Sequence, residues 1–188
     1  MVQDGVVQVM VIAGPAGSGK TTLADAVAKR LSAPHLDFDV VSAGVVAATQ
    51  ALHPELSEEA VLVACKEERY DALAEAIREC AERADPLASS VVIASAPLSQ
   101  YTQDSDLWAA WLAKCGSPTF VDLVWLDLDP KVRWNRMTNR KSSRDQALLE
   151  SGIRPDPAPL PVVEHRVIDT SRPMAERVRL ALAPFGND

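Results

Sequence analysis

The sequence predicts an α/β fold in which helices cover both faces of a parallel β-sheet. Short apolar segments of strand length alternate along the chain with longer stretches whose apolar residues recur at helical spacing. Such alternation is typical of parallel sheets. The first apolar segment, 6–13, is rich in β-branched residues and ends at Gly14, as expected of a strand buried on both faces. The 188 residues suffice for one domain with its own hydrophobic core.

Turn and cap residues divide the first half of the chain into two strands and three helices. Pro34 ends the first helix, whose last turn carries two basic residues, a favourable place for cations. Pro54 ends the second helix. Ser57 is a good N-cap for a third helix, which is long enough to contain a kink. The predicted elements, in order, are strand 6–13, helix 21–31, strand 35–41, helix 42–52 and helix 57–83.

The second half of the chain alternates three strands with three helices. Asp104 or Ser105 caps a helix that carries two tryptophans. Asp129 and Pro130 have the pattern of an N-cap followed by proline at the first helical position, and they open an arginine-rich helix. Alternating prolines between 155 and 161 predict a stiff, extended connector. The predicted elements are strand 91–96, a helix from 104 or 105, strand 120–128, helix 129–140, strand 165–169 and helix 174–183.

The charge and cysteine content argue against several classes of protein. The formal net charge is -7 and the pI is about 5.0, so the broad basic face of a general nucleic-acid or membrane-surface binder is absent from the sequence. No apolar run reaches the roughly 18 residues of a membrane span, and the N-terminus lacks a basic export signal. The three cysteines lie far apart without a Cys-x-x-Cys pair, which argues against a zinc site and suits a reducing compartment. We therefore expect a cytoplasmic protein.

The segment from Gly14 to Thr21, GPAGSGKT, fits the phosphate-loop pattern G-x-x-x-x-G-K-[ST] in full. Glycines let successive backbone N–H groups point into a concave nest for phosphate oxygens, and the following helix adds its positive dipole end. Lys20 would reach the β- and γ-phosphates of ATP, and the Thr21 hydroxyl would be a ligand of Mg²⁺. The predicted nucleotide-binding residues of the loop are Gly14, Ala16, Gly17, Ser18, Gly19, Lys20, Thr21 and Thr22.

The early phosphate loop, the chain length and the acidic segment Asp37-Phe38-Asp39 after the second strand together resemble small-molecule P-loop kinases. This group includes shikimate kinase, gluconate kinase, chloramphenicol phosphotransferase and bacterial relatives of AAA type. The resemblance covers nearly the whole chain in its organisation, although only the phosphate loop is highly specific. It implies a three-layer P-loop NTPase fold with a five-stranded parallel sheet in the order 2-3-1-4-5. It also implies one kinase domain over 1–188 with an arginine-bearing lid at about 136–156.

Asp37 and Asp39 are the predicted acidic residues of the site. At positions i and i+2 they would share one side of a strand and project from its C-terminal edge, where ligands bind in such sheets. The resemblance assigns Asp37 to the metal and Asp39 to the acceptor hydroxyl as base or orienter, and either aspartate could exchange roles with the other. The alternative interpretation is a pair of capping or turn aspartates.

The predicted lid contains a cationic stripe. Arg133, Arg136 and Arg140 recur at i, i+3 and i+7 and therefore share a helix face, which Lys141 and Arg144 extend. In the kinases that this chain resembles, such arginines close over ATP and stabilise the transferring phosphoryl group. Arg136 and Arg140 are the predicted catalytic arginines, and Arg144 is a further nucleotide ligand. The alternative is a solvated helix face with surface ion pairs.

Further residues enter the candidate site through the same resemblance. The third strand ends in Ser95-Ala-Pro-Leu without an acid, and the similar Ser-Ala segment of gluconate kinases implies that the Ser95 hydroxyl assists the metal or the acceptor. Segment 169–173 resembles the loop that wraps the adenine, which assigns Ser171 and Arg172 to nucleotide binding. A plain helix cap before Pro173 explains that segment equally well.

Two other pairs of residues are interpreted as structural. Asp127 ends the fourth strand in a pattern that resembles a magnesium-associated aspartate, but in the implied topology that strand leads to the lid helix. We therefore interpret Asp127 and Asp129 as capping residues. Arg69 and Tyr70 are interpreted as a surface pair on a helix rather than as part of the acceptor pocket.

The sequence thus predicts an ATP- and Mg²⁺-dependent kinase that phosphorylates a hydroxyl of a small polar metabolite or natural product, such as an antibiotic. Ser95-Ala-Pro-Leu departs from shikimate kinases, and Val40-Val41 departs from the Leu-His of gluconate kinases. One alternative is a nucleotide-dependent switch or ATPase that acts through a protein partner. Another is a polynucleotide end kinase, against which the overall acidity argues. The acceptor, the choice of ATP or GTP, and a monomeric or homodimeric state stay open.

Overall fold

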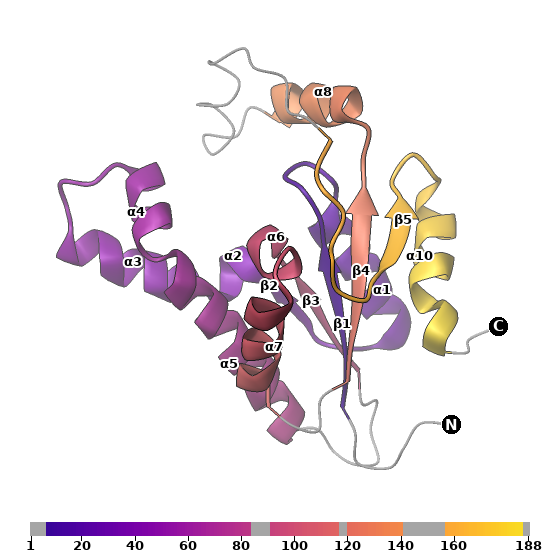
Figure 1. The fold of residues 1–188 in the computed structure, drawn as a ribbon, viewed down its shortest axis with the longest axis horizontal. Helices are drawn as coiled ribbons and strands as arrows, with labels where there is room; N and C mark the ends of the chain where they lie inside the picture. The colour runs from indigo at the N-terminus through magenta and orange to yellow at the C-terminus, as the bar shows by residue number, and fades with distance from the viewer. Residues whose placement is uncertain (1–6, 84–90, 117–119, 141–156, 186–188) are drawn as a thin grey trace.

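Five parallel strands form one sheet in the order β2-β3-β1-β4-β5, which confirms the predicted fold class (Figure 1). The computed structural model describes residues 7–83, 91–116, 120–140 and 157–185, apart from the side chain of Arg140. The central strand β1 pairs with β3 on one side and with β4 on the other, so that Gln8 lies opposite both Val91 and Phe120. The strands are β1 (Gln8–Ala13), β2 (His35–Asp37), β3 (Val91–Ser95), β4 (Phe120–Asp127) and β5 (Arg166–Asp169).

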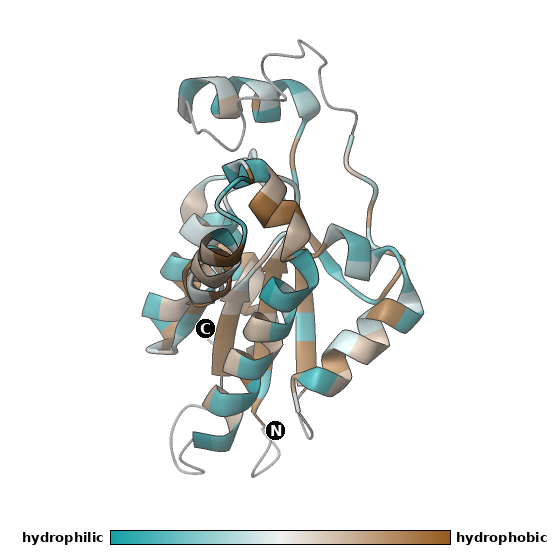
Figure 2. Cartoon of the chain, turned by 90° about the vertical axis from the view of Figure 1, so that its left-hand side faces the viewer, coloured by the Kyte–Doolittle hydropathy of each residue, from teal (hydrophilic) through white to brown (hydrophobic). Residues whose placement is uncertain are grey.

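Helices pack on both faces of this sheet and create two separate hydrophobic layers. Alternate residues of β1 point to opposite faces: Val11 belongs to the core beneath α5 and α7, and Ile12 to the core beneath α1 and α10. Both faces of the inner strands are therefore buried, which explains why β1 and β3 read as apolar runs and why brown is prominent in the sheet in Figure 2. The helices are α1 (Lys20–Leu31), α2 (Phe38–Val41), α3 (Ala43–Leu52), α4 (Glu58–Ala64), α5 (Lys66–Arg83), α6 (Ser99–Thr102), α7 (Ser105–Lys114), α8 (Pro130–Arg140), α10 (Met174–Leu182) and a 3-10 turn (Ala183–Phe185).

Two predicted elements differ from the structure. The strand predicted over 35–41 ends at Asp37, because the Asp37 side chain accepts hydrogen bonds from the backbone N–H groups of Asp39 and Val40 and so caps α2. The helix predicted over 57–83 is two helices that meet at Cys65, whose backbone is not helical. Ser57 caps the first of them as predicted, accepting from the Ala60 N–H at 3.3 Å.

Helices α3 and α4 form an arm that projects from the sheet, at the left of Figure 1. Although α3 is rich in Ala and Val, none of its residues is buried. The arm points toward the viewer in Figure 2, where both brown and teal segments are visible on it. Because α2 and α3 follow Asp37 directly, the arm begins beside the ends of the strands. In the part of the chain that the structure describes, no helix has the length and apolar character needed to cross a membrane.

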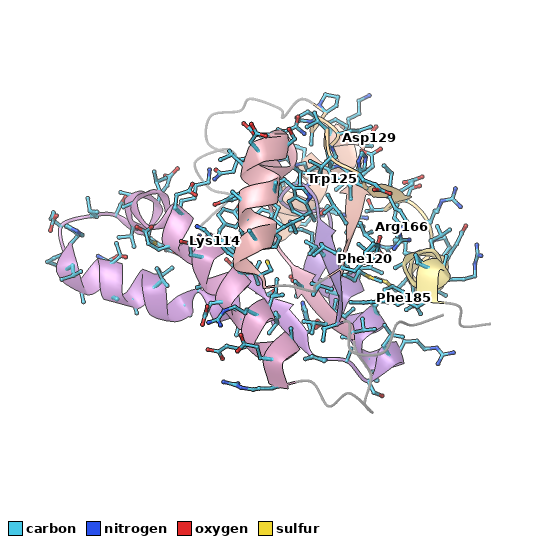
Figure 3. The ribbon with its side chains drawn as sticks, turned by 60° about the horizontal axis from the view of Figure 1, so that its bottom comes forward. Lys114, Phe120, Trp125, Asp129, Arg166 and Phe185 are labelled. Atoms are coloured by element: carbon cyan, nitrogen blue, oxygen red, sulfur yellow. The ribbon has the colours of Figure 1, made fainter. Side chains whose placement is uncertain are left out.

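Hydrogen bonds from a side chain of the edge strand β5 connect it to β4 and to α10. Arg166 of β5 donates from Nε to Asp122 of β4 at 2.9 Å and from Nη1 to the Leu180 carbonyl of α10 at 2.8 Å (Figure 3). Asp129 lies where β4 leads into α8, and it accepts hydrogen bonds from the backbone N–H groups of Lys131 and Val132. Its predicted role as a helix cap is therefore what the structure shows.

Candidate active site

A cavity of about 810 Å³ opens at the carboxyl ends of the strands. The phosphate loop and the start of α1 line one part of it, and the ends of β2 and β3 line another. Arg136 of α8, with Met174 and Arg177 of α10, also lines the cavity. Ligand sites in open α/β sheets occupy this edge, so the fold brings the predicted phosphate loop and the predicted acidic residues to one place.

The phosphate loop joins β1 to α1 through backbone conformations that need glycine. Gly14 has a φ of 144°, and a Cβ atom on it would lie 2.8 Å from the Leu126 carbonyl oxygen of β4. Gly19 has a φ of 89° and immediately precedes α1. A side chain at either position would strain the loop. Lys20 follows Gly19, and its Nζ donates to the Pro15 carbonyl oxygen at 3.0 Å, so the ammonium lies over the loop.

Asp37 lies beside Thr21, the predicted magnesium ligand. Its Oδ2 accepts hydrogen bonds from the Thr21 hydroxyl at 2.8 Å and from the Ser95 hydroxyl at 3.2 Å. Burial raises the pKa of Asp37, but the hydrogen bonds from Thr21, from the Val40 and Asp39 N–H groups and from Ser95 together lower it by more. Asp37 is thus held as a carboxylate at the end of the phosphate loop.

The oxygen atoms of Thr21 and Asp37 suit Mg²⁺. This ion is commonly held by one or two protein oxygens together with phosphate oxygens and water, rather than by a complete protein cage. Among the described residues, no group of three or more His, Cys, Asp or Glu side chains could hold a metal by itself. The donors present therefore fit a magnesium ion that arrives with a nucleotide.

Asp39 lies in the first turn of α2 and pairs with a buried arginine. Arg69 of α5 donates from Nη2 to Asp39 at 2.8 Å and from Nε to the Ser42 hydroxyl at 3.1 Å. Its guanidinium carbon lies 4.3 Å from the centroid of the Phe38 ring, within the range of a cation–π contact. Arg69 is only 8% exposed. The buried guanidinium therefore fixes the orientation of the Asp39 carboxylate.

The interpretation of Arg69 and Tyr70 as a surface pair is wrong. Both residues are buried, and the Tyr70 ring packs 4.7 Å from that of Phe38 between their centroids. An arginine becomes buried when its charge is paired and its N–H groups are satisfied. Asp39 and Ser42 supply those partners from a distant part of the sequence, so the residues around Arg69 do not indicate that its side chain is buried.

A histidine that sequence reasoning left out connects Ser95 to the surface. His35 of β2 lies with Nε2 at 2.9 Å from the Ser95 hydroxyl and with Nδ1 at 2.6 Å from Asp25 of α1. Ser95 in turn donates to Asp37, so a continuous chain of hydrogen bonds runs from Asp25 to Asp37. His35 and Ser95 lie 60 residues apart, and no local motif links them.

The arginines of α8 lie over the phosphate loop. Arg133 donates from Nε to the Ala16 carbonyl oxygen at 3.1 Å, and Arg136 lines the cavity with its Nη2 at 3.5 Å from the Thr170 carbonyl oxygen. The helix predicted to carry the lid arginines thus starts close to the site. The side chain of Arg140, together with Arg144 and most of the predicted lid at 136–156, lies outside the described residues.

The segment after β5 makes local contacts of the kind expected for a turn. Asp169 accepts from the Ser171 N–H and from the Ser171 hydroxyl, each at 2.7 Å, while Arg172 pairs with Glu176 of α10. Met174 and Arg177, a little further along, line the cavity instead. The nucleotide-binding roles of Ser171 and Arg172 stay predictions, and Arg177 is a cavity residue that sequence reasoning missed.

Comparison with known proteins finds one family and several solved structures. A family model for an AAA domain, AAA_18, matches residues 10–152. The structure is similar to a gluconokinase from Sinorhizobium meliloti 1021, at 20% identity and a TM-score of 0.56 over 94% of this chain and 90% of that one. It is similar to a sugar kinase from Janibacter sp. HTCC2649, at 24% identity and a TM-score of 0.58 over 94% and 93%.

A third similar structure is an APS kinase of Mycobacterium tuberculosis, solved in complex with AMPPNP and APS. Its identity is 16% and its TM-score 0.63, over 96% of this chain and 98% of that one. A search of curated protein sequences found no match. At these identities the likeness establishes a shared fold, whereas the family model covers more than half of the chain.

Proposed function

The chain belongs to the AAA domain family, and from the geometry of its cavity we propose that it is an ATP-dependent kinase acting on a hydroxyl group of a small polar molecule. The observation that carries the proposal is the meeting of three groups in one cavity. The phosphate loop, the Thr21–Asp37 pair and the Asp39 carboxylate all line it. Phosphoryl transfer needs these parts together: a phosphate cradle, a metal position and a group for the acceptor hydroxyl.

The nucleotide side of the proposed site binds and neutralises the phosphates. Backbone N–H groups of the loop and the N-terminus of α1 would hold the phosphate oxygens, and Lys20 would move from the Pro15 carbonyl onto the β- and γ-phosphates. A bound Mg²⁺ would neutralise charge on the phosphate oxygens while the γ-phosphoryl group transfers to the acceptor. Thr21 and Asp37 would hold that ion, and Arg136 would stabilise charge on the transferring group.

The acceptor side orients a hydroxyl and removes its proton. Asp39 is the proposed base, because its carboxylate lines the cavity and Arg69 holds it in place through the 2.8 Å ion pair. A fixed carboxylate can align the attacking oxygen and accept its proton as the new P–O bond forms. Phe38, Ala96 and Pro97 line the same cavity.

The similar solved structures support a small-molecule acceptor. They include a gluconokinase, a sugar kinase, and an APS kinase bound to AMPPNP and APS, so this fold holds a nucleotide analogue and an acceptor together in that APS kinase. We extend this arrangement to the present chain as part of the proposal. A metabolite or natural product with a free hydroxyl is the acceptor class that we infer, in a monomer or a homodimer.

The test is ADP release from ATP and Mg²⁺ in the presence of a panel of hydroxyl compounds: sugar acids, sugars, amino acids, nucleosides and aminoglycosides. We expect one class to stimulate turnover in the wild type. Asp39→Asn should lower the stimulated kcat by about 10²-fold or more, and Lys20→Ala should lower kcat/KM by at least about 10²-fold. Lys29→Ala is the matched control, because Lys29 lies exposed on the same helix as Lys20.

The outcomes separate the alternatives. If ATP binds and no acceptor in a broad panel stimulates ADP release, a nucleotide-dependent switch becomes the better explanation. Stimulation by oligonucleotides that weakens steeply with salt would instead indicate a polynucleotide kinase. If the stimulated rate survives Asp39→Asn, the transfer stands but Asp39 is not the base, and Asp37→Asn is the next variant to measure.

A further inference from the structure

Arg177 is a cavity residue that lies over the phosphate loop, and the contacts among the described residues do not explain its position. It lies near the start of α10 and lines the cavity together with Gly19, Lys20 and Thr22. Its Nη1 lies 4.0 Å from the position that a Cβ atom on Gly19 would take. The guanidinium therefore stands at the N-terminus of α1, where the backbone N–H groups and the helix dipole already favour an anion.

Within the described residues, this guanidinium has no carboxylate partner. The Nε of Arg177 is buried and makes no hydrogen bond there. Other arginines near the same edge of the sheet are paired: Arg166 with Asp122, and Arg172 with Glu176. A buried donor without a partner is costly, and a ligand with acceptor oxygens would satisfy it.

A second cation, Arg136, lies in the same cavity as Arg177 and acts on its charge. Burial lowers the pKa of Arg177, and the positive charge of Arg136 lowers it further. Arg136 lines the same cavity from α8. Two guanidinium groups that repel one another in a common cavity are stabilised by an anion placed near both of them, and phosphate oxygens match their geometry.

The topology of the sheet indicates which phosphates Arg177 meets. Asp39, directly after β2, and Ser95, at the end of β3, lie on one side of the phosphate loop, and α10 follows β5 at the opposite edge of the sheet. The transferring γ-phosphate must face the acceptor, so the inner phosphates and the nucleoside extend toward β4 and β5. We infer that Arg177 binds the α- and β-phosphates of the nucleotide, an inference that rests on the proposed function for the presence of a nucleotide in this cavity.

Calorimetric titration with ADP and with a non-hydrolysable ATP analogue tests the inference. Arg177→Met keeps the apolar stem and removes the charge, and we expect it to weaken both ligands by the same factor, about tenfold or more. Arg177→Lys should recover part of the loss. Arg179→Met is the matched control on the exposed side of α10 and should bind both ligands as the wild type does.

The distribution of the loss decides the result. Equal losses for ADP and the ATP analogue support contact with the inner phosphates. A loss confined to the ATP analogue places Arg177 at the γ-phosphate and overturns the inference, as does unchanged binding of both ligands. If the wild type binds neither nucleotide, the proposed function fails and the inference fails with it.

A second measurement separates binding from folding. Without ligand, Arg177→Met should unfold at a temperature no lower than the wild type, because the change removes an unpaired buried donor and a repulsion with Arg136. A marked decrease in the unfolding temperature would show that Arg177 stabilises the fold itself, and would overturn its role as a ligand-binding residue.

Discussion

At the ends of β2 and β3, on the proposed acceptor side of the cavity, the polar side chains make hydrogen bonds to one another. In the phosphate loop and the region after β5, several buried polar atoms make none among the described residues. Asp37 accepts from Thr21 and Ser95, and Asp39 accepts from Arg69. Behind them, His35 contacts Ser95, and Ser42 accepts from Arg69. The acceptor side is thus organised before any ligand arrives.

The nucleotide side shows the opposite condition. Among the described residues, four buried side-chain atoms lack a hydrogen-bond partner: Ser18 Oγ, Trp125 Nε1, Thr170 Oγ1 and Arg177 Nε. Ser18 belongs to the phosphate loop, and Thr170 and Arg177 belong to the segment that follows β5. Of these four residues, Arg177 is the one that lines the cavity, where a ligand with acceptor oxygens could satisfy its donor. The comparison teaches that the polar side chains at the ends of β2 and β3 hold one another in place, while Arg177 on the other side keeps a donor that a ligand could satisfy.

The largest effect that sharpens this comparison is expected at Arg69. Arg69→Ala should lower the free energy of unfolding by about 3 kcal/mol, because it removes the buried guanidinium together with its hydrogen bonds to Asp39 and Ser42 and its contact with the Phe38 ring. Urea unfolding of the ligand-free protein measures this loss of stability. Arg83→Ala removes an exposed pair with Glu79 and should change stability by less than about 0.5 kcal/mol. A loss below about 1 kcal/mol for Arg69→Ala would show that the acceptor side is not held together as described.

A pair of buried serines tests the comparison most directly. Ser95, at the end of β3, and Ser18, in the phosphate loop, are 3% and 0% exposed. Ser95→Ala should cost about 1.5 kcal/mol in the ligand-free protein, because Asp37 and His35 each lose one hydrogen bond at a buried position. Ser18→Ala should cost nothing measurable, because its hydroxyl bonds to nothing in the described structure. Equal losses from the two substitutions in thermal or urea unfolding would contradict the contrast between the sides.

The smallest effect is expected at Asp37 and depends on pH. The pKa of Asp37 is lowered from 3.8 in the folded protein. Its carboxylate therefore stabilises the fold at pH values above about 3.8, and this stabilisation is lost as the pH falls through the pKa of the folded state. Asp37→Asn should therefore be less stable than the wild type by about 1 kcal/mol at pH 7, and the difference should close in acid. Asp104→Asn makes the same exchange at the N-cap of α7 and measures the effect on capping alone. A stability difference that persists unchanged to pH 2 would show that Asp37 is not held as a carboxylate.

Part of the site could be predicted because its residues are adjacent in sequence or follow from the sheet. The phosphate loop is one continuous segment with its own backbone requirements, so its motif sufficed. The proximity of Asp37 to Thr21 followed from the expectation that parallel strands end at one edge. The strand geometry predicted for Asp37 and Asp39 was wrong, because Asp37 caps α2 and leaves Asp39 in a helix.

Other parts of the site could not be predicted, because their contacts join distant segments. Arg69 and Asp39 lie 30 residues apart, and neither shows its partner in the local pattern. The contact between His35 and Ser95 spans 60 residues. Arg177 reaches the phosphate loop from a helix near the other end of the chain. A charged residue on an amphipathic helix reads as solvent-exposed unless its partner is known.

The sequence by itself determined the alternation of strands and helices, the parallel sheet and the phosphate loop, since each depends on periodicity or on conformations set by neighbouring residues. The tertiary structure decided which polar side chains are buried and paired. That decision follows from desolvation: a buried charge is stable only where packing brings a partner to it, and packing is a property of the whole chain. Arg69 found such partners within the protein, and we infer that Arg177 finds one in the nucleotide.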